Sequence, residues 1–241
     1  MSKVVCIDPG HGGKDPGAVA NGLKEKDITL AIALKLGNIL EKHKIKVVYT
    51  RTTDKYLSLT ERANISNRAN ADALVSIHTN SATNSSARGL EVWTSRGQTQ
   101  GDVLATCIGE QLMEDFKGVP FRADYSDGDL DKEENFTVIA KAKAPACLVE
   151  LGFISNKEDN KLQTGNQDEF ALAIAKGVLK FLGILYKGGN TMTNTNDNPS
   201  PWAKEAWEWA KKEGITDGTR PKEPATREEI ITMIYRAKKV K

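Results

Sequence analysis

The chain has 241 residues, of which 39% are hydrophobic, so its length allows one domain of ordinary size with a packed core plus a small second one. Its 34 basic and 32 acidic residues nearly cancel to a net charge of +2, which excludes the strong cationic field typical of nucleic-acid-binding proteins. No apolar run approaches the roughly 20 residues that a membrane-spanning helix needs. We therefore expect neither nucleic acid nor membrane as a partner.

The first apolar run, from Lys3 to Asp8, predicts a short buried strand that ends in a tight loop. His11 lies on that loop, and four glycines surround it: Gly10, Gly12, Gly13 and Gly17. Open α/β sheets bind their ligands just beyond the carboxyl ends of such strands. A lone loop histidine, in contrast, more often has no chemical task, so His11 needs support from elsewhere in the chain.

The start of the chain and its cysteines both indicate a protein made and folded in the cytoplasm. The first strand pattern begins at Lys3 and leaves no room for a signal peptide. The cysteines are Cys6, Cys107 and Cys147, an odd number without CxxC spacing. We expect them to be small buried hydrophobic residues and neither disulfides nor metal ligands.

Helical and strand patterns alternate along the next part of the chain. Ser155 and Glu158 have the spacing of a capping box, which predicts a helix start. The alternation predicts an α/β fold with a mostly parallel twisted sheet and helices on both faces. The expected helices are Asp27–His43, Leu59–Asn70, Asp102–Phe116 and Glu169–Leu182, the expected strands are Ile45–Thr50, Leu74–Ile77, Leu90–Trp93 and Pro145–Phe153, and Gly118–Asp131 is expected to be a long polar loop.

Two further buried-strand patterns deliver a polar side chain at the same end as the first. His78 follows Leu74–Ile77, and Glu150 lies near the end of Pro145–Phe153. Three apolar runs that each present one histidine or glutamate at one edge of a sheet predict a functional site. His43 is different, because it closes a helix among lysines and is expected to be solvated.

His11, Glu25 and His78 together offer two imidazoles and one carboxylate, a ligand set that catalytic zinc uses while a fourth position stays open for water. Zinc lowers the pKa of such a water to about 7. A second carboxylate that does not bind the metal must then move the proton, and Glu150 fits because it ends a buried strand. The chain lacks HExxH, and the same ligands would accept other divalent ions.

Several separated motifs, in this order, resemble the zinc-dependent N-acetylmuramoyl-L-alanine amidases of the amidase-3 family: IDPGHGGKDPGA, GLKEKDITLAIA, TRTTD with LSLTERANISNRANAD, SIHTNS and CLVELGFISN. The resemblance covers roughly Lys3 to Leu185. It implies hydrolysis of the amide that joins the lactyl group of N-acetylmuramic acid to L-alanine in peptidoglycan. Carried over by position, His11, Glu25 and His78 bind one Zn²⁺ and Glu150 is the catalytic acid/base.

Three other polar residues, Arg51, Arg62 and Asn80, lie near the predicted rim of this site. They could hold carboxylates or amides of the stem peptide. A structural salt bridge or a hydrogen bond to a loop is an equally open interpretation of each.

The sequence predicts a catalytic domain over residues 1–185, a flexible linker over 186–199 and a small helical module over 200–241. Ser200 with Pro201, and Thr226 with Glu229, indicate two helix starts in the module. Its WAKEAWEWAKKEGITDGT and PATREEIITMIYRA stretches resemble a single S-layer-homology repeat, which implies attachment to cell-wall polymers.

The module also carries features that indicate self-association. Trp202, Trp207 and Trp209 fall on one expected helix and cannot all face one small core, so we expect another copy to cover some of them; partial exposure is the alternative. The residues from Lys187 to Met192 can be encoded by a ribosome-binding site followed by ATG. The gene could therefore also yield a free C-terminal module starting at Met192, unless this stretch is an ordinary polar linker.

A cytoplasmic product that acts on the cell wall after release best suits a phage endolysin, which lyses the host at the end of infection. A sporulation amidase acting from the mother cell is an alternative role. A zinc peptidase that cuts the stem peptide is the nearest chemical rival, and a wall-binding protein without activity is a rival of another class.

Overall fold

A six-stranded sheet forms the centre of the first of two units, Met1–Lys187 and Gly188–Lys241, in this computed structural model, which describes residues 2–188, 204–216, 233–235 and 237–238. Strand β1 pairs in parallel with β4 and β5, and β5 pairs in parallel with β8. Strand β6 is antiparallel to β8 and parallel to β7. The strands run in the order β4 (Lys46–Tyr49), β1 (Val4–Pro9), β5 (Ala73–Asn80), β8 (Ala146–Phe153), β6 (Leu90–Thr94) and β7 (Lys132–Glu133).

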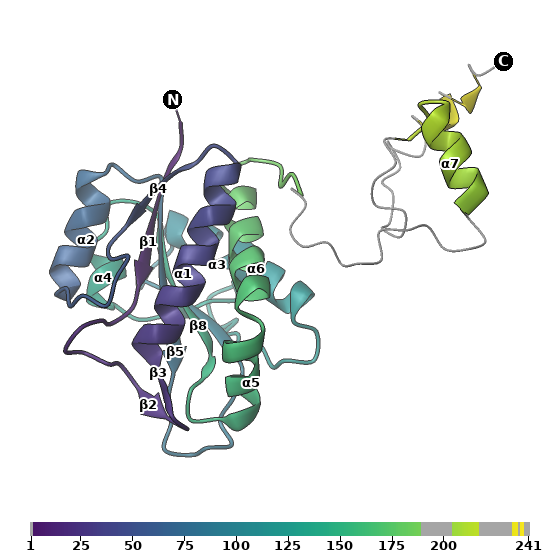
Figure 1. Cartoon of the computed structure of the whole chain (residues 1–241). Coiled ribbons are helices and arrows are strands. Elements are labelled where there is room, and N and C mark those ends of the chain that lie inside the picture. Colours follow the sequence, from purple (N-terminus) through teal and green to yellow (C-terminus); the bar gives the residue numbers. More distant parts are fainter. Residues whose placement is uncertain (1, 189–203, 217–232, 236, 239–241) are drawn as a thin grey trace. The chain divides into compact units, whose positions relative to one another are not determined.

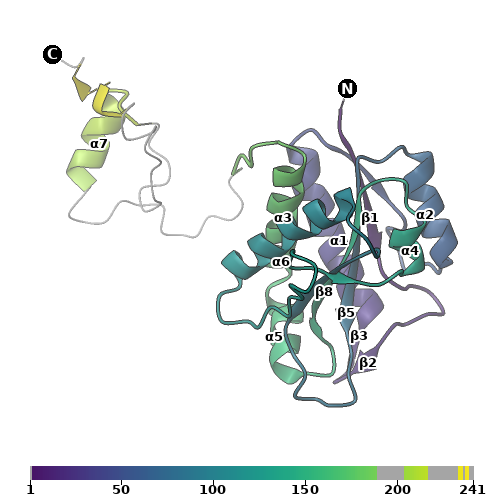
Figure 2. The ribbon, with the colours of Figure 1, turned by 180° about the vertical axis from the view of Figure 1, so that it is seen from behind.

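Helices cover both faces of this sheet, as Figures 1 and 2 show from opposite sides. One face carries α1 (Glu25–Lys42), α3 (Gln100–Asp115) and α6 (Gln167–Phe181), and the other carries α2 (Leu59–Arg68) and α4 (Thr137–Ala140). Helix α5 (Lys157–Gly165) packs at the end of β8. The expected α/β class with a mostly parallel sheet is confirmed.

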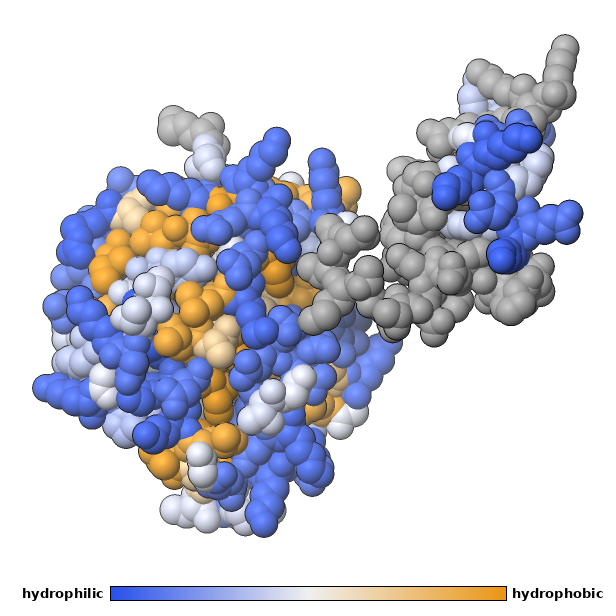
Figure 3. All heavy atoms as spheres, viewed as in Figure 1, coloured by the Kyte–Doolittle hydropathy of each residue, from blue (hydrophilic) through white to orange (hydrophobic). Residues whose placement is uncertain are grey.

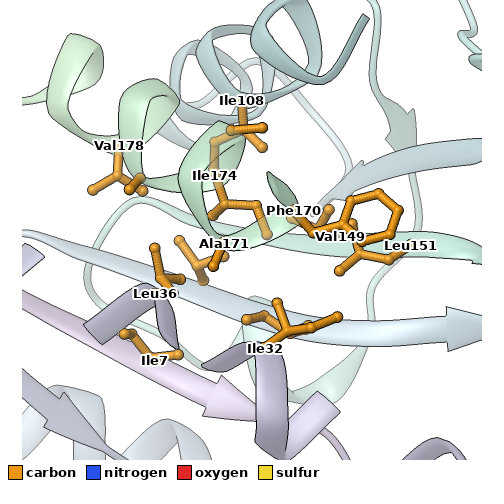
Figure 4. Close-up of a cluster of buried hydrophobic side chains, with 14 of the residues drawn as sticks. Ile7, Ile32, Leu36, Ile108, Val149, Leu151, Phe170, Ala171, Ile174 and Val178 are labelled. Carbon is orange, nitrogen blue, oxygen red and sulfur yellow. The ribbon is translucent and has the colours of Figure 1, made fainter. Parts of the chain in front are cut away.

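The larger core lies between the sheet and the layer of α1, α3 and α6. Apolar residues of α1 recur at the helical spacing, and Ile28, Ile32, Leu36 and Leu40 are all buried. In Figure 4 the side chains of α1 and α6 meet those of the strands, with Phe170 among them. A smaller cluster of Cys6, Leu74, Val138, Ile139, Ala146 and Leu148 fills the other face.

The starts of two helices differ from the expected ones. Helix α1 begins at Glu25, two residues before its expected start, directly after the hairpin of β2 (Val19–Ala20) and β3 (Leu23–Lys24). The expected capping box of Ser155 and Glu158 is wrong: Asn156 caps α5, and its side chain accepts from the backbone N–H groups of Glu158 and Asp159. The Ser155 hydroxyl instead accepts from the backbone N–H of Ala82, at 3.1 Å.

The cysteines of the first unit lie in its interior, and its surface combines hydrophilic and apolar residues. Cys6, Cys107 and Cys147 are free and buried, as predicted. On the face drawn in Figure 3, hydrophilic residues surround apolar patches of the first unit. Among the residues that the structure describes, no helix combines the length and the apolar character needed to cross a bilayer.

In the second unit the structure describes helix α7 (Lys204–Lys212), which follows the helix start expected at Ser200 with Pro201, and helical residues at 233–235. Trp209 on this helix is 49% exposed. Trp202, the linker residues 189–199, the Met192 start and the Thr226–Glu229 capping box lie outside the described residues.

Gly177→Ala tests how closely α6 packs on α3. A Cβ atom at Gly177 would lie 2.6 Å from Ile108 Cα and 2.9 Å from Cys107 O, which are backbone atoms that no side-chain rotation can move. We expect a loss of about 1–3 kcal/mol in the free energy of unfolding, measured by urea denaturation. Gly165→Ala on α5 meets no atom within 4 Å and serves as the control, so equal losses in both variants would contradict this packing.

Candidate metal centre and active site

Three neighbouring parallel strands bring the predicted site residues to one edge of the sheet. His11 follows β1, His78 lies in β5, and Glu150 lies in β8 opposite His78 in the strand register. Glu25 does not belong to a strand of the sheet, because it is the first residue of helix α1. Because these strands are parallel, their carboxyl ends meet at the same edge, where α/β sheets hold their ligands.

His11, Glu25 and His78 form a group whose potential ligand atoms all lie within 4.8 Å of one another. His11 Nε2 lies 3.1 Å from Glu25 Oε2, and His78 Nδ1 lies 2.9 Å from Glu25 Oε1. The two imidazole rings meet edge to face, with their centroids 5.0 Å apart. The structure therefore brings together the three residues predicted as metal ligands.

The surrounding backbone fixes the Glu25 carboxylate. Glu25 is 4% exposed, and its two oxygens also accept hydrogen bonds from the backbone N–H groups of Ala18 (2.9 Å) and Thr79 (3.1 Å). Burial alone would raise the pKa of Glu25, but hydrogen bonds from His11 and His78 lower it below its ordinary value. The group is thus charged and ready to bind a cation.

Asp15 is a further residue of this site that the sequence reasoning missed. Its Oδ2 lies 2.9 Å from His11 Nδ1, and its Oδ1 accepts the backbone N–H of Gly17 at 3.0 Å. A carboxylate on the second ring nitrogen fixes the orientation of a histidine ligand. The sequence signal that could have identified Asp15 is its position four residues after His11 in a glycine-rich loop.

Two glycines are required by the close approach of the backbone to the metal-ligand group. A Cβ atom at Gly10 would lie 2.4 Å from His78 Cε1, and one at Gly17 would lie 2.6 Å from Glu25 Oε2. His11 itself has φ of 60°, a left-handed conformation that is uncommon outside glycine. The loop is therefore shaped around the imidazoles and the carboxylate.

Arg51 and Arg62 hold this loop from inside the protein, which agrees with the structural interpretation of the two that the sequence left open. They are 4% and 2% exposed. Arg62 donates to Asp8 Oδ1 at 2.9 Å and to the carbonyl oxygens of Pro9 and His11, each at 2.7 Å. Arg51 donates to the carbonyl oxygens of Pro9 at 3.0 Å and Gly10 at 2.8 Å.

Glu150 lies beside the group as a carboxylate without a compensating charge. Burial first, and then the neighbouring carboxylates of Glu25 and Glu91, raise its pKa well above the ordinary value. Its Oε2 atom is buried and makes no hydrogen bond. A group of this kind has a high affinity for a proton.

Glu91 lies on the other side of Glu150, opposite it in the register of β6 and β8. Although burial opposes it, hydrogen bonds from Lys132 and Arg122 lower the pKa of Glu91. These bonds are 2.9 and 2.5 Å long, and Asn80 adds a third at 3.0 Å. Asn80 therefore makes a structural hydrogen bond to Glu91 in β6, which agrees with the structural interpretation of the two that the sequence left open.

A cleft of about 350 Å³ opens next to the two histidines. Tyr56 and Leu59 at its side are 42% and 53% exposed. It provides room for a substrate against His11 and His78. Its lining residues are Asp8, Gly10, His11, Asp15, Tyr56, Leu57, Leu59, Arg62, His78 and Val138.

A histidine–glutamate–histidine group that can hold a metal ion, next to a second, half-buried carboxylate and a cleft, is the arrangement of a metal-assisted hydrolase. The family model of the N-acetylmuramoyl-L-alanine amidases (Amidase_3) matches residues 5–180, and the chain belongs to this family. It is a peptidoglycan amidase, as its sequence motifs predicted.

Known relatives agree with this family. The endolysin of Bacillus phage SPP1 is 34% identical over 83% of this chain and 73% of its own length. The sporulation-specific N-acetylmuramoyl-L-alanine amidase of Bacillus subtilis is 38% identical over 72% of this chain and 64% of its own length. Amidase AmiC2 of Nostoc punctiforme superposes with a TM-score of 0.69 at 37% identity, covering 75% of this chain and 97% of that structure.

Arg62→Met tests the buried clamp on the loop of His11. The substitution keeps most of the side-chain length but leaves the Asp8 carboxylate, which is 0% exposed, without its cation. Removing one partner of such a pair costs about 3–5 kcal/mol. Urea unfolding measures the loss.

Arg68→Met is the matched control, because Arg68 is exposed on the same helix α2. We expect it to change the free energy of unfolding by less than about 0.5 kcal/mol. A similar small change in Arg62→Met would contradict the role of the clamp.

Proposed function

We propose that His11, Glu25 and His78 hold one Zn²⁺ in this peptidoglycan amidase. The convergence of their ligand atoms within 4.8 Å is the observation that carries the proposal. Each imidazole already lies close to a Glu25 oxygen, His11 Nε2 at 3.1 Å from Oε2 and His78 Nδ1 at 2.9 Å from Oε1. Mixed nitrogen and oxygen donors suit zinc better than calcium or magnesium.

Zinc, when bound, supplies a water of lowered pKa and polarises the scissile carbonyl group. Glu150 accepts the proton of the attacking water, since its carboxylate has a raised pKa and it lies opposite the ligand His78 in the strand register. It then donates this proton to the amide nitrogen as the bond between the lactyl carbonyl carbon and that nitrogen breaks. The stem peptide leaves with a free amine on its L-alanine. The muramoyl side is left as a carboxylic acid, whose proton then passes to that amine or to solvent and leaves the carboxylate.

The cleft beside His11 and His78 can accommodate the part of the peptidoglycan next to the scissile amide. Its apolar rim at Tyr56 and Leu59 can contact a sugar ring or an alanine methyl group. Glu91 keeps its negative charge through Lys132 and Arg122, so it raises the affinity of Glu150 for the proton that Glu150 takes from the water.

Glu150→Gln separates proton transfer from metal binding. We expect at least a 10²-fold loss in the rate of wall lysis, because the amide cannot accept the proton. Zinc content, measured by elemental analysis, and adsorption to purified walls should stay at the wild-type level. Glu158→Gln makes the same change at an exposed position on α5 and should remain fully active.

Two outcomes would contradict these assignments. A fully active Glu150→Gln variant would remove Glu150 from the mechanism, and a variant without zinc would make it a metal ligand. Mass analysis of the released fragments tests the bond that is cut: the amidase frees intact peptides with an L-alanine amino terminus, whereas a stem-peptide peptidase does not. A zymogram that shows no lysis at all would leave only a wall-binding role. Lysis that continues in the presence of a chelator would contradict the dependence on zinc.

The role that we favour is that of a phage endolysin, made in the host cytoplasm and active on the wall after release. The similarity to the SPP1 endolysin supports this role, because it extends over 83% of the chain, against 72% for the sporulation-specific amidase. The sporulation role remains the alternative. The amidase domain spans residues 1–185 in this proposal, and residues 186–199 link it to the module.

Residues 200–241 are proposed to bind cell-wall polymers and to associate with another copy. Trp209, exposed on α7, supports association because a second module could cover its indole. Linked copies would raise avidity for a repetitive wall. The second copy can be a full chain or the free module that starts at Met192.

The free module gives a direct prediction. Protein produced from the native gene and purified through a C-terminal tag should contain a second species that begins at Met192, detected by intact-mass spectrometry. Synonymous recoding of the codons from Lys187 to Asn190 should remove this species, since it changes the message and not the protein. Absence of the fragment from the native gene would end the proposal of an internal start.

A further inference from the structure

Three aspartates converge at the start of α3, on the side of the sheet where β6 and β7 lie. Asp102 belongs to the first turn of α3, and Asp129 and Asp131 end the long loop that precedes β7. One oxygen from each of the three lies within 4.8 Å of the others. The cluster is separate from the His11, Glu25 and His78 group.

Each aspartate uses its other oxygen for a local hydrogen bond. Asp102 Oδ2 accepts from the backbone N–H of Thr99, in the capping box of α3. Asp131 Oδ2 accepts from the Thr94 hydroxyl at 2.5 Å, and Asp129 Oδ2 accepts from Gln98 at 3.3 Å. These bonds fix the side chains and leave Oδ1 of all three buried without any hydrogen-bond partner.

Three buried carboxylate oxygens without a donor need a positive partner. Asp102 is 5% exposed and Asp131 is 1% exposed. None of the ion pairs among residues 2–188 includes any of the three aspartates. Burial and the neighbouring Asp129 and Asp102 raise the pKa of Asp131 to about 7, although the Thr94 hydroxyl opposes this shift.

A shared proton is the simplest alternative to a cation, and it accounts for the cluster only in part. One proton can join two carboxylate oxygens, which leaves the third oxygen buried and unpaired. A divalent cation contacts all three at once. Asp129 is only partly buried, so an ion and its water ligands can enter from that side.

We propose that Asp102, Asp129 and Asp131 bind a Ca²⁺ ion through their Oδ1 atoms. The donor set consists of oxygens alone, which suits hard cations and not zinc. Calcium is favoured over magnesium because it accepts irregular geometry and completes its six to eight ligands with water or further oxygens. This site is independent of the proposed zinc centre.

The ion would fasten the long loop to the sheet. The loop that ends at Asp129 and Asp131 also carries Arg122, and Lys132 follows directly in β7. Both cations pair with Glu91, the neighbour of Glu150. Calcium binding would therefore stabilise the loop that keeps Glu91 charged next to the proposed acid/base.

The test uses the full-length, zinc-loaded protein in buffer freed of calcium with a chelating resin. Thermal unfolding and isothermal titration calorimetry are followed with CaCl2 and, in parallel, with MgCl2. We expect the melting temperature to rise and saturate at or below millimolar Ca²⁺, with a smaller rise for Mg²⁺. Elemental analysis before and after titration must show unchanged zinc.

Asp129→Asn locates the site, because it removes the most accessible ligand charge without emptying the core. We expect at least a tenfold loss in Ca²⁺ affinity. Asp124→Asn, an exposed aspartate of the same loop, is the matched control and should keep wild-type affinity. The proposal is overturned by a wild-type protein that shows no calcium-dependent shift, by an equal or larger response to Mg²⁺, or by wild-type affinity in Asp129→Asn.

Discussion

The buried ion pair of Asp8 and Arg62 is the interaction on which the rest of the site depends. Asp8 ends β1 inside the sheet, and besides Arg62 it accepts hydrogen bonds from the hydroxyls of Thr50, which follows β4, and Ser76 in β5. One carboxylate thereby joins the ends of three strands to helix α2. The same guanidinium group satisfies the backbone carbonyls of the loop, so the loop can turn sharply through His11 without leaving buried acceptors unpaired.

Beyond this clamp, the edge of the sheet carries carboxylates with opposite electrostatic surroundings. Glu25 receives two imidazoles and two backbone donors and is held charged. Glu91 receives Lys132, Arg122, Trp93 and Asn80 and is also held charged. Glu150 lies on β8 between His78 and Glu91 in the strand register, has no such donor at Oε2, and burial raises its affinity for a proton. Neighbouring carboxyl groups are thus separated into different protonation states by their hydrogen-bond partners, as acid–base chemistry requires.

The sequence could place His11, His78 and Glu150 together because each follows or ends a buried parallel strand, and strand ends of one direction share an edge. Glu25 begins a helix and was assigned through the family motifs, since periodicity alone does not show which helix end faces the sheet edge. For Arg51 and Arg62 the sequence left substrate contact and a structural role equally open, and it did not show that both are buried. The carbonyl groups of Pro9 and His11 need a buried donor only once the loop is folded, so the sequence does not show this need. The cluster of Asp102 with Asp129 and Asp131 also depends on the fold, because the sequence around Asp129 and Asp131 has the composition of a solvated loop.

Among the residues that the structure describes, β8 is the last strand in sequence, yet it lies inside the sheet between β5 and β6. A nascent chain that still lacks residues 146–153 can present the two imidazoles and Glu25, but the sheet is divided at its centre and Glu150 is missing. During synthesis, and in any product truncated before that point, the assembly of the edge therefore stays incomplete. In the mechanism proposed above, the reacting edge is therefore complete only after nearly the whole domain has been synthesised.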